Sequence, residues 1–220
     1  MKTAVLLFTF LFILTFSFAQ ELKLKYEINM KSDDPEMQMQ LQMSEGSTLT
    51  IYSKDASSRV EMNMGGLMKT TTVLDLDKKK GLIIMDGMFG KQAATFAGGD
   101  FDKHTEQDDD VEIEFLNETK EILGYLCKKA IVSVEEEDAE VIFWYTEELD
   151  YSKAYLVDNS KYKIPGVALE YSIEQPEVTM KFTAVLLEKS VKNPKEIFSL
   201  EIPKGYTEKS FFEISNMSGQ

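Results

Sequence analysis

Histidine, cysteine and arginine are almost absent from this 220-residue sequence, which has one of each: His104, Cys127 and Arg59. A catalytic triad or a histidine-bearing zinc site could draw only on His104 and Cys127, which lie in differently patterned segments. No glycine-rich phosphate loop, HExxH motif or GxSxG motif is present either. The sequence therefore predicts no catalytic residue, no metal site and no cofactor.

One class of enzyme needs none of these residues. A hydrolase can work with two carboxylates alone, and the chain has 38 acidic residues. No spacing singles out one pair among them. A carboxylate-dependent hydrolase therefore remains an alternative without named residues.

A single cysteine also excludes an internal disulfide, so the core must stabilise the fold. Lys128 and Lys129 follow Cys127 and would favour its thiolate form. Lone cysteines more often behave as small buried hydrophobic residues. We therefore expect Cys127 to be buried rather than reactive.

Basic residues are outnumbered by acidic ones, 24 to 38, which gives a formal net charge of −14 and a sequence pI of about 4.6. Such a chain repels the phosphates of nucleic acids and the surfaces of anionic membranes. Neither is therefore expected as a partner. We attribute the charge to solubility.

The one long hydrophobic run lies at residues 4–16, after Met1-Lys2. Ser17-Phe18-Ala19 then places small residues at the two positions that signal peptidase reads. A membrane anchor would need ~20 apolar residues and a basic flank, and this run has neither. We therefore predict that residues 1–19 are a signal peptide cleaved after Ala19.

Cleavage would leave residues 20–220, which we interpret as one β domain in the periplasm or outside the cell. Residue 20 is glutamine, so the mature N-terminus is not expected to carry a lipid. No membrane span is expected after cleavage. The mature protein is predicted to be soluble.

Alternation of apolar and polar residues recurs along the chain, as in half-buried strands. It is clearest at 22–30, 37–43, 60–64, 111–115, 141–145, 167–173, 178–186 and 198–202, and weaker at 48–54, 70–76, 81–85 and 129–134. Short links between these segments favour antiparallel neighbours. About ten strands in one sheet should curl, so we predict an all-β half-barrel with little helix.

Residues 87–110 are the exception, with four glycines and no alternation. An irregular segment of this length inside a compact domain is typical of a lid or a mobile insertion. We therefore predict a lid-like insertion here.

Methionine is unusually common, with twelve residues in all. Eight crowd the first half of the chain: Met37, Met39, Met43, Met62, Met64, Met68, Met85 and Met88. Flexible thioethers suit a pocket for varied apolar ligands, although filling the core of a curved sheet is the favoured interpretation. Both alternatives stay open at this point.

Arg59 carries the only guanidinium group of the chain. This group must form an ion pair or reach water, because an unpaired buried charge is costly. A bound polar or anionic head group would be one partner of Arg59, and Glu61 or Glu36 the alternative. We therefore hypothesise a ligand-binding set, which consists of Arg59, Met37, Met39, Met62 and Met64.

Several phrases occur together in a familiar order: Ser58–Met62, Thr72–Leu76, Glu118–Lys129, Phe143–Thr146 and Ile164–Val167. This order resembles an exported family of Bacteroidetes, domain of unknown function 4412. That family is similar in architecture to the periplasmic lipoprotein-carrier fold. The resemblance implies a curled antiparallel sheet whose concave face holds acyl chains under a helical lid, with Arg59 comparable to an arginine near the ligand.

We therefore expect a non-catalytic envelope protein that binds a lipid or acyl chain on the concave face of a curled sheet. One alternative is an interaction module for an envelope protein partner, with a sheet filled by its own side chains. The carboxylate-dependent hydrolase is the other. A cavity on the concave face would separate the first hypothesis from the second.

Overall fold

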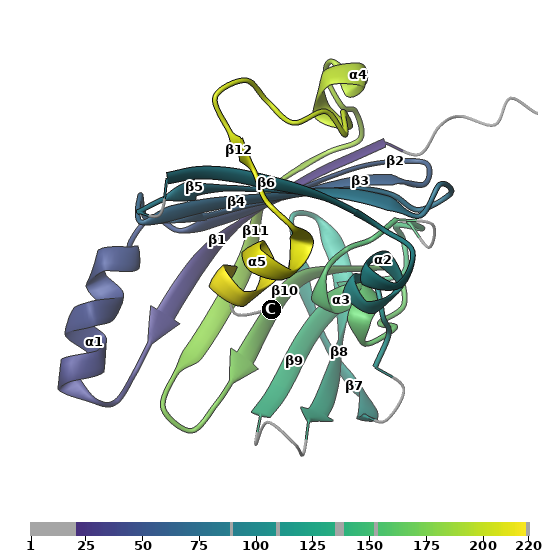
Figure 1. The fold of residues 1–220 in the computed structure, drawn as a ribbon. Helices are drawn as coiled ribbons and strands as arrows, with labels where there is room; N and C mark the ends of the chain where they lie inside the picture. The colour runs from purple at the N-terminus through teal and green to yellow at the C-terminus, as the bar shows by residue number, and fades with distance from the viewer. Residues whose placement is uncertain (1–20, 89, 109–110, 135–138, 152–153, 219–220) are drawn as a thin grey trace, which may run out of the picture.

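The computed structural model of this protein describes residues 21–88, 90–108, 111–134, 139–151 and 154–218. Twelve strands form one open sheet in the order β12-β6-β5-β4-β3-β2-β1-β11-β10-β9-β8-β7. Figure 1 shows that the sheet bends strongly, with β2–β6 above and β7–β10 below. The prediction of a mostly β protein with one curled, mainly antiparallel sheet is confirmed.

The strands are β1 (Glu21–Lys31), β2 (Thr48–Lys54), β3 (Ser57–Met64), β4 (Met68–Asp75), β5 (Lys80–Gly87), β6 (Gly90–Ala97), β7 (Glu112–Ile122), β8 (Tyr125–Val134), β9 (Ala139–Thr146), β10 (Val167–Glu174), β11 (Thr179–Glu188) and β12 (Thr207–Glu208). Most neighbours in space are neighbours in sequence, because short turns join antiparallel strands. The pairing of β1 with β11 joins the β2–β6 portion of the sheet to the β7–β10 portion.

The helices are short: α1 (Pro35–Leu41), η1 (Gln42–Ser44), α2 (Gly99–His104), α3 (Asp158–Lys161), α4 (Pro194–Ile197) and α5 (Phe211–Ser218). Figure 1 places α2, α3 and α5 inside the bend of the sheet and α4 outside it. Among the described residues, no helix has the length and apolar character needed to cross a membrane. The predicted signal peptide lies outside the described residues.

Alternation correctly predicted the strands that have one covered face. In β1, Leu22, Leu24, Tyr26 and Ile28 are all buried, and the residues between them are not. Successive side chains of a strand point to opposite faces, so one apolar row meets the core. The prediction was therefore most reliable where only one face of the sheet is covered.

Aromatic rings fill the concave face of the lower half of the sheet. Tyr171 stacks on Phe182 with ring centroids 4.3 Å apart, and on Phe143 at 5.6 Å. The edge of Tyr26 meets the Tyr171 ring at 5.8 Å, and its hydroxyl donates to the Ala168 carbonyl at 2.6 Å. The protein thus occupies this part of its concave face with its own side chains.

Both faces of the β4–β6 portion are covered. On the concave side, Phe96 and Ile83 pack with Phe101 of α2 and Ile214 of α5. On the convex side, Val73, Leu82 and Ala93 pack under Leu200, Ile202 and Tyr206.

The strand predicted at residues 37–43 is wrong, because this segment forms α1 and η1. The Asp34 carboxylate accepts hydrogen bonds from the Glu36 N–H (2.7 Å) and the Met37 N–H (3.0 Å). Pro35 suits the first helical position, and the unbranched side chains that follow lose little freedom in a helix. The helix-start signal therefore outweighed the alternation.

The lid-like insertion predicted at 87–110 also needs correction, because most of its described residues form β6 and α2. The register of the β5–β6 hairpin pairs Gly87 with Gly90. Ala93 and Ala94 are both fully buried, since both faces of β6 are covered. A strand buried on both faces shows no alternation.

Residues 198–202 do not form the predicted strand but an irregular segment that packs on the convex face. β12 then pairs with β6 in parallel, with Thr207 opposite Gln92. At the other end of the sheet, β7 is an edge strand with a bulge between Leu116 and Thr119.

Candidate functional site

Arg59 lies on the outward face of β3 and is held by other groups of the protein. Its Nε lies 2.7 Å from Glu61 Oε1, and its Nη1 donates to the Ile197 carbonyl at 3.2 Å. Glu61, one of the alternatives to a bound head group, is therefore the partner. Lys69 Nζ completes the group, 3.6 Å from Glu61 Oε2.

The predicted methionines do not share a site with Arg59. Met62 lies opposite Leu49 in the β2–β3 ladder and packs against the core, whereas Arg59 lies opposite Tyr52 on the other face. Met64 is two residues after Met62 and therefore lies on the same face of β3. Met37 and Met39 lie on α1. The structure therefore does not bring Arg59 and these methionines together in one pocket.

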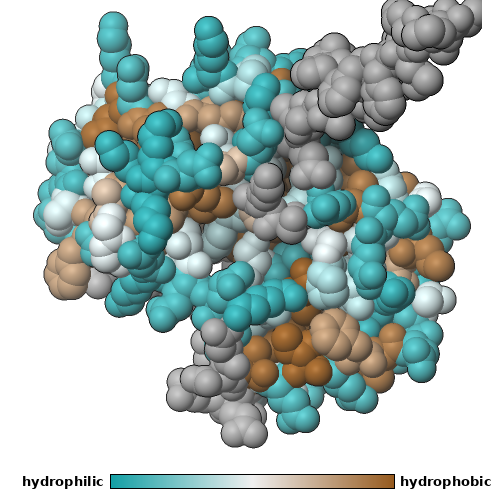
Figure 2. Space-filling view, turned by 90° about the vertical axis from the view of Figure 1, so that its right-hand side faces the viewer, coloured by the Kyte–Doolittle hydropathy of each residue, from teal (hydrophilic) through white to brown (hydrophobic). Residues whose placement is uncertain are grey.

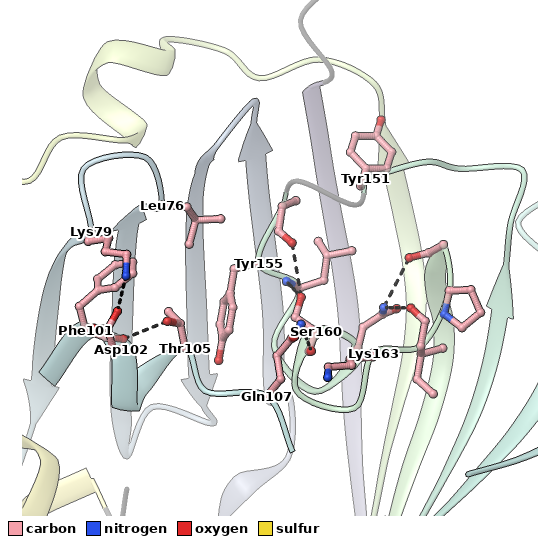
Figure 3. A pocket seen from close by; sticks show the side chains of 16 residues that line it. Leu76, Lys79, Phe101, Asp102, Thr105, Gln107, Tyr151, Tyr155, Ser160 and Lys163 are labelled. Atoms are coloured by element: carbon pink, nitrogen blue, oxygen red, sulfur yellow. Dashed lines mark hydrogen bonds and ion pairs between the residues drawn. The ribbon is translucent and has the colours of Figure 1, made fainter. Parts of the chain in front are cut away.

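A half-open cleft lies instead inside the bend, between α2 and a segment that we call the α3 strap (residues 154–166). Its volume is about 540 Å³, within the ~300–1,000 Å³ typical of ligand pockets. Figure 3 shows Leu76 and Lys79 on one side, Thr105 and Tyr155 in the middle and Lys163 on the other side.

The floor of the cleft is apolar and its rim is polar. Phe101, Leu156 and Ile164 are buried and belong to the surrounding cores. On the rim, Lys79 Nζ lies 2.9 Å from Asp102 Oδ1, and both side chains are exposed. An apolar floor with a charged rim suits a ligand with an apolar body and a polar end.

Polar groups of the α3 strap are used to fix its own shape. The Asn159 amide donates to the Ile164 carbonyl at 2.8 Å and accepts from the Ala168 N–H at 2.7 Å. The Ser160 hydroxyl accepts from the Leu156 N–H at 2.7 Å. These bonds tie the strap to the start of β10 and hold one wall of the cleft in place.

The strap is also fastened to β3. The Tyr155 N–H donates to the buried Ser58 hydroxyl at 2.9 Å. Burial raises the pKa of the Tyr155 phenol to about 12, so the ring stays neutral at physiological pH. Tyr155 thus gives the cleft an uncharged aromatic surface.

Figure 2 shows the molecule from the right-hand side of Figure 1. Hydrophilic side chains cover most of this face, and hydrophobic ones lie in separate patches. The exposed surface here is therefore mixed rather than one continuous apolar area.

Cys127 is buried, as predicted, and has no exposed surface. Burial raises the pKa of its thiol to about 11, although the nearby Lys120 acts in the opposite direction. The thiol is therefore protonated at neutral pH, which makes it a poor nucleophile.

His104 lies beside the cleft within a cluster of rings. Its ring centroid is 5.2 Å from that of Phe96 and 6.2 Å from those of Tyr155 and Phe211. Burial lowers the pKa of its imidazole below 6.5, so the folded protein disfavours the charged form.

We therefore expect the His104→Gln variant to lose less stability in mild acid than the wild type. Below a pH of about 6.5 the unfolded chain gains a proton on His104 that the folded chain resists. The wild-type free energy of unfolding should consequently fall relative to the variant as the pH drops from 7 to 5. Urea unfolding of both proteins across this range measures the difference, and a difference independent of pH would contradict it.

None of the cleft residues was predicted as a site. The available signal was the dense turn chemistry of the strap, which carries Asn159-Ser160 and Pro165-Gly166 within a few residues. That pattern indicates a structured loop but does not say which distant segments it faces.

Comparison with known proteins gives a partial family match. The model of the family described as N-glycanase peptide, N-terminal domain, matches residues 99–156. This stretch runs from α2 through β7–β9 to the first part of the strap, and it includes Phe101 and Tyr155 of the cleft. No curated protein matches the chain.

Solved structures are similar over most of the chain. PNGF-II in its P21 crystal form has a TM-score of 0.54 at 14% identity, covering 90% of this chain and 33% of that one. An uncharacterised conserved protein from Thermus thermophilus has a TM-score of 0.50 at 10% identity, covering 87% of this chain and 90% of that one. Identities this low show a shared fold alone.

The likeness to the lipoprotein-carrier fold is weak. A putative outer membrane lipoprotein-sorting domain from Vibrio parahaemolyticus has a TM-score of 0.19 at 6% identity, covering 80% of this chain and 87% of that one. The resemblance to domain of unknown function 4412 stays a prediction. The chain spans about one third of the length of PNGF-II and shares the fold of that part, and its residues 99–156 match the family model of the N-glycanase peptide N-terminal domain.

Proposed function

We propose that this chain is an exported, non-catalytic binding domain whose ligand lies in the cleft between α2 and the α3 strap. The observation that carries the proposal is the cleft itself, which has an apolar floor and a charged rim on the concave side of the sheet. The signal-like residues 1–19 support export. The same feature supports a location in the periplasm or outside the cell.

The ligand that suits the cleft is a lipid or fatty acid. Its chain would lie on Tyr155, Leu156 and Phe101, and its polar end would lie near Lys79 and Lys163 on the rim. Each buried methylene contributes ~0.8 kcal/mol, so a chain of moderate length binds without any specific motif. The proposed ligand thus lies in this cleft and not on the part of the concave face that aromatic rings fill.

The chemistry of the lining supports binding rather than catalysis. Among the described residues that line the cleft, Asp102 is the only carboxylate, and it is paired with Lys79. A hydrolase of the two-carboxylate type needs a second one across the reacting bond. The amide of Asn159 and the hydroxyl of Ser160 are already occupied by the strap.

A titration with a fluorescent fatty acid tests the proposal. We expect saturable binding by the wild type and by Lys195→Glu, which reverses an exposed charge on α4. Ala154→Trp should fill the cleft and weaken binding at least about tenfold, or ~1.4 kcal/mol. Lys163→Glu should also weaken binding, because it repels the carboxylate.

Thermal melting of each variant separates loss of binding from loss of folding. Wild-type protein that shows no saturable binding would reject the lipid. Equal binding by all four proteins would move the ligand away from this cleft.

A second candidate is a glycosylated peptide, and the family match favours it. The matched family is named for an N-glycanase, and the match includes eight residues that line the cleft, Phe101 and Tyr155 among them. Tyr155 and the polar rim offer an aromatic surface beside hydrogen-bonding groups. Binding of an N-glycosylated peptide, and not of the same peptide without its glycan, would favour this candidate over the lipid.

A further inference from the structure

Methionines that are far apart in the sequence meet at one end of the sheet. We define the methionine tip as Met39, Met43, Met64, Leu67, Met68 and Met88. It is built from α1, η1 and the turns of the β3–β4 and β5–β6 hairpins. Figure 1 shows α1 at this end of the molecule, away from α2 and the α3 strap.

Backbone contacts hold the three segments together. A Cβ at Gly65 would lie 2.8 Å from the Met43 carbonyl oxygen, so the first turn fits closely against η1. A Cβ at Gly87 would lie 3.0 Å from the Leu67 carbonyl oxygen, so the two turns also touch. The tip is therefore a structural unit and not a set of separate side chains.

The tip exposes a large share of the apolar surface of the protein. Met88 is 79% exposed, Met39 66%, Met43 63% and Leu67 40%. A groove of about 550 Å³ runs between the two turns, beside Leu67, Met68 and Met88. Of the eight first-half methionines, Met85 is fully buried and Met62 and Met68 pack against the core, whereas core filling does not account for the exposed Met39, Met43 and Met88.

Exposed thioethers add little to folding, whereas several large apolar side chains exposed at one end of a molecule are typical of a surface that binds a partner. Methionine is flexible and polarizable, and it adapts to partners of different shape. A partner that binds this surface would therefore contribute apolar side chains.

The charges around the tip indicate which charge such a partner would carry. Asp33, Asp34 and Glu36 start α1, and Glu45 follows η1; all four are exposed. Among the described residues, no lysine or arginine forms an ion pair with Asp33, Glu36 or Glu45. The nearby cations Lys69 and Lys91 are already paired, at 3.6 Å with Glu61 and at 3.4 Å with Asp86. Lys31 is the remaining cation of this end, so its uncompensated charge is negative.

We propose that the methionine tip docks a cationic amphipathic segment of a partner protein. Apolar side chains of that segment would enter the groove between the two turns, and its lysines or arginines would face the carboxylates of α1 and η1. The same carboxylates disfavour the rival occupant, an anionic lipid surface. The tip and the cleft lie on different elements, so this proposal does not rest on the proposed function.

Fluorescence anisotropy with a labelled amphipathic peptide of leucine and lysine tests the docking. The variant Met39→Gln/Met43→Gln/Met88→Gln keeps side-chain length and makes the tip polar. The matched control, Leu126→Gln/Phe212→Gln, removes apolar surface that is equally exposed elsewhere. We expect the wild type and the control to bind alike, and the methionine variant to bind at least about tenfold more weakly, or ~1.4 kcal/mol.

A charge variant, Asp33→Asn/Glu36→Gln/Glu45→Gln, should also weaken binding and reduce its salt dependence. Equal binding by the methionine variant and the wild type would overturn the proposal, as would absence of binding by the wild type. Sedimentation with phosphatidylcholine vesicles that contain anionic phosphatidylglycerol covers the rival occupant. Vesicle binding that the methionine variant loses, without peptide binding, would assign the tip to lipid instead.

Discussion

Gly166→Ala is expected to destabilise the domain by at least about 3 kcal/mol, measured as the free energy of unfolding in urea. Gly166 joins the α3 strap to β10 and has a φ of +66°, which side chains other than glycine rarely adopt. A Cβ at this position would lie 2.0 Å from the Thr146 carbonyl oxygen, which belongs to the ladder of β9 and β10. The backbone must move, and the wall of the cleft moves with it.

Gly98→Ala is the matched control, because Gly98 has nearly the same φ of +61° but no atom within 4 Å of an added Cβ. With φ of +61° and ψ of −130°, this variant should lose only the free energy of a strained backbone conformation, roughly 1–3 kcal/mol. Trp144, the only tryptophan, reports the unfolding of both variants by fluorescence. If the two variants lost similar free energies of unfolding, the backbone near Thr146 would be able to move away from the added Cβ at little energetic cost.

Phe143→Ala is expected to cost about 3–5 kcal/mol, because the ring is fully buried and the side chains around it cannot collapse into the space. Phe143 stacks on Tyr171 at 5.6 Å and meets the Tyr162 ring at 6.1 Å, which links β9 to β10 and to the segment after α3. The same urea experiment measures the loss.

Phe212→Ala provides the comparison for this second change. Phe212 lies on α5 and is 74% exposed, so its truncation should change the free energy of unfolding little. If Phe143→Ala were as mild as Phe212→Ala, the concave face would be loosely packed. A loosely packed face would again leave room there for an acyl chain.

The sequence predicted strands well where one face meets the core and the other meets solvent, as in β1. It failed for β6, whose Ala93 and Ala94 each pack against a different layer, because a strand covered on both sides shows no alternation. It failed for α1 because methionine and glutamine alternate there, and the prediction followed this alternation instead of the local helix-start signal at Asp34-Pro35. Glu61, the partner of Arg59, was predicted only as one of three alternatives, beside Glu36 and a bound head group.

The cleft could not be predicted from the sequence. Its walls come from the end of β4, from α2 and from the α3 strap, which are brought together only by the bend of the sheet. Residues such as Leu76, Phe101 and Leu156 look like ordinary core residues in their own segments. Their common site is a property of the packing and of no single motif.

The two edges of the sheet are closed to further strands in different ways. At one edge, β12 pairs with Gln92 and Ala93 of β6, so this part of the β6 backbone is already used. At the other edge, β7 has a bulge between Leu116 and Thr119 and carries Glu112, Glu114, Glu118 and Glu121. Two copies of β7 would bring these carboxylates together, and the bulge would break their register. Pairing of this edge with another strand is therefore disfavoured, and the carboxylates of β7 contribute to the net charge of −14.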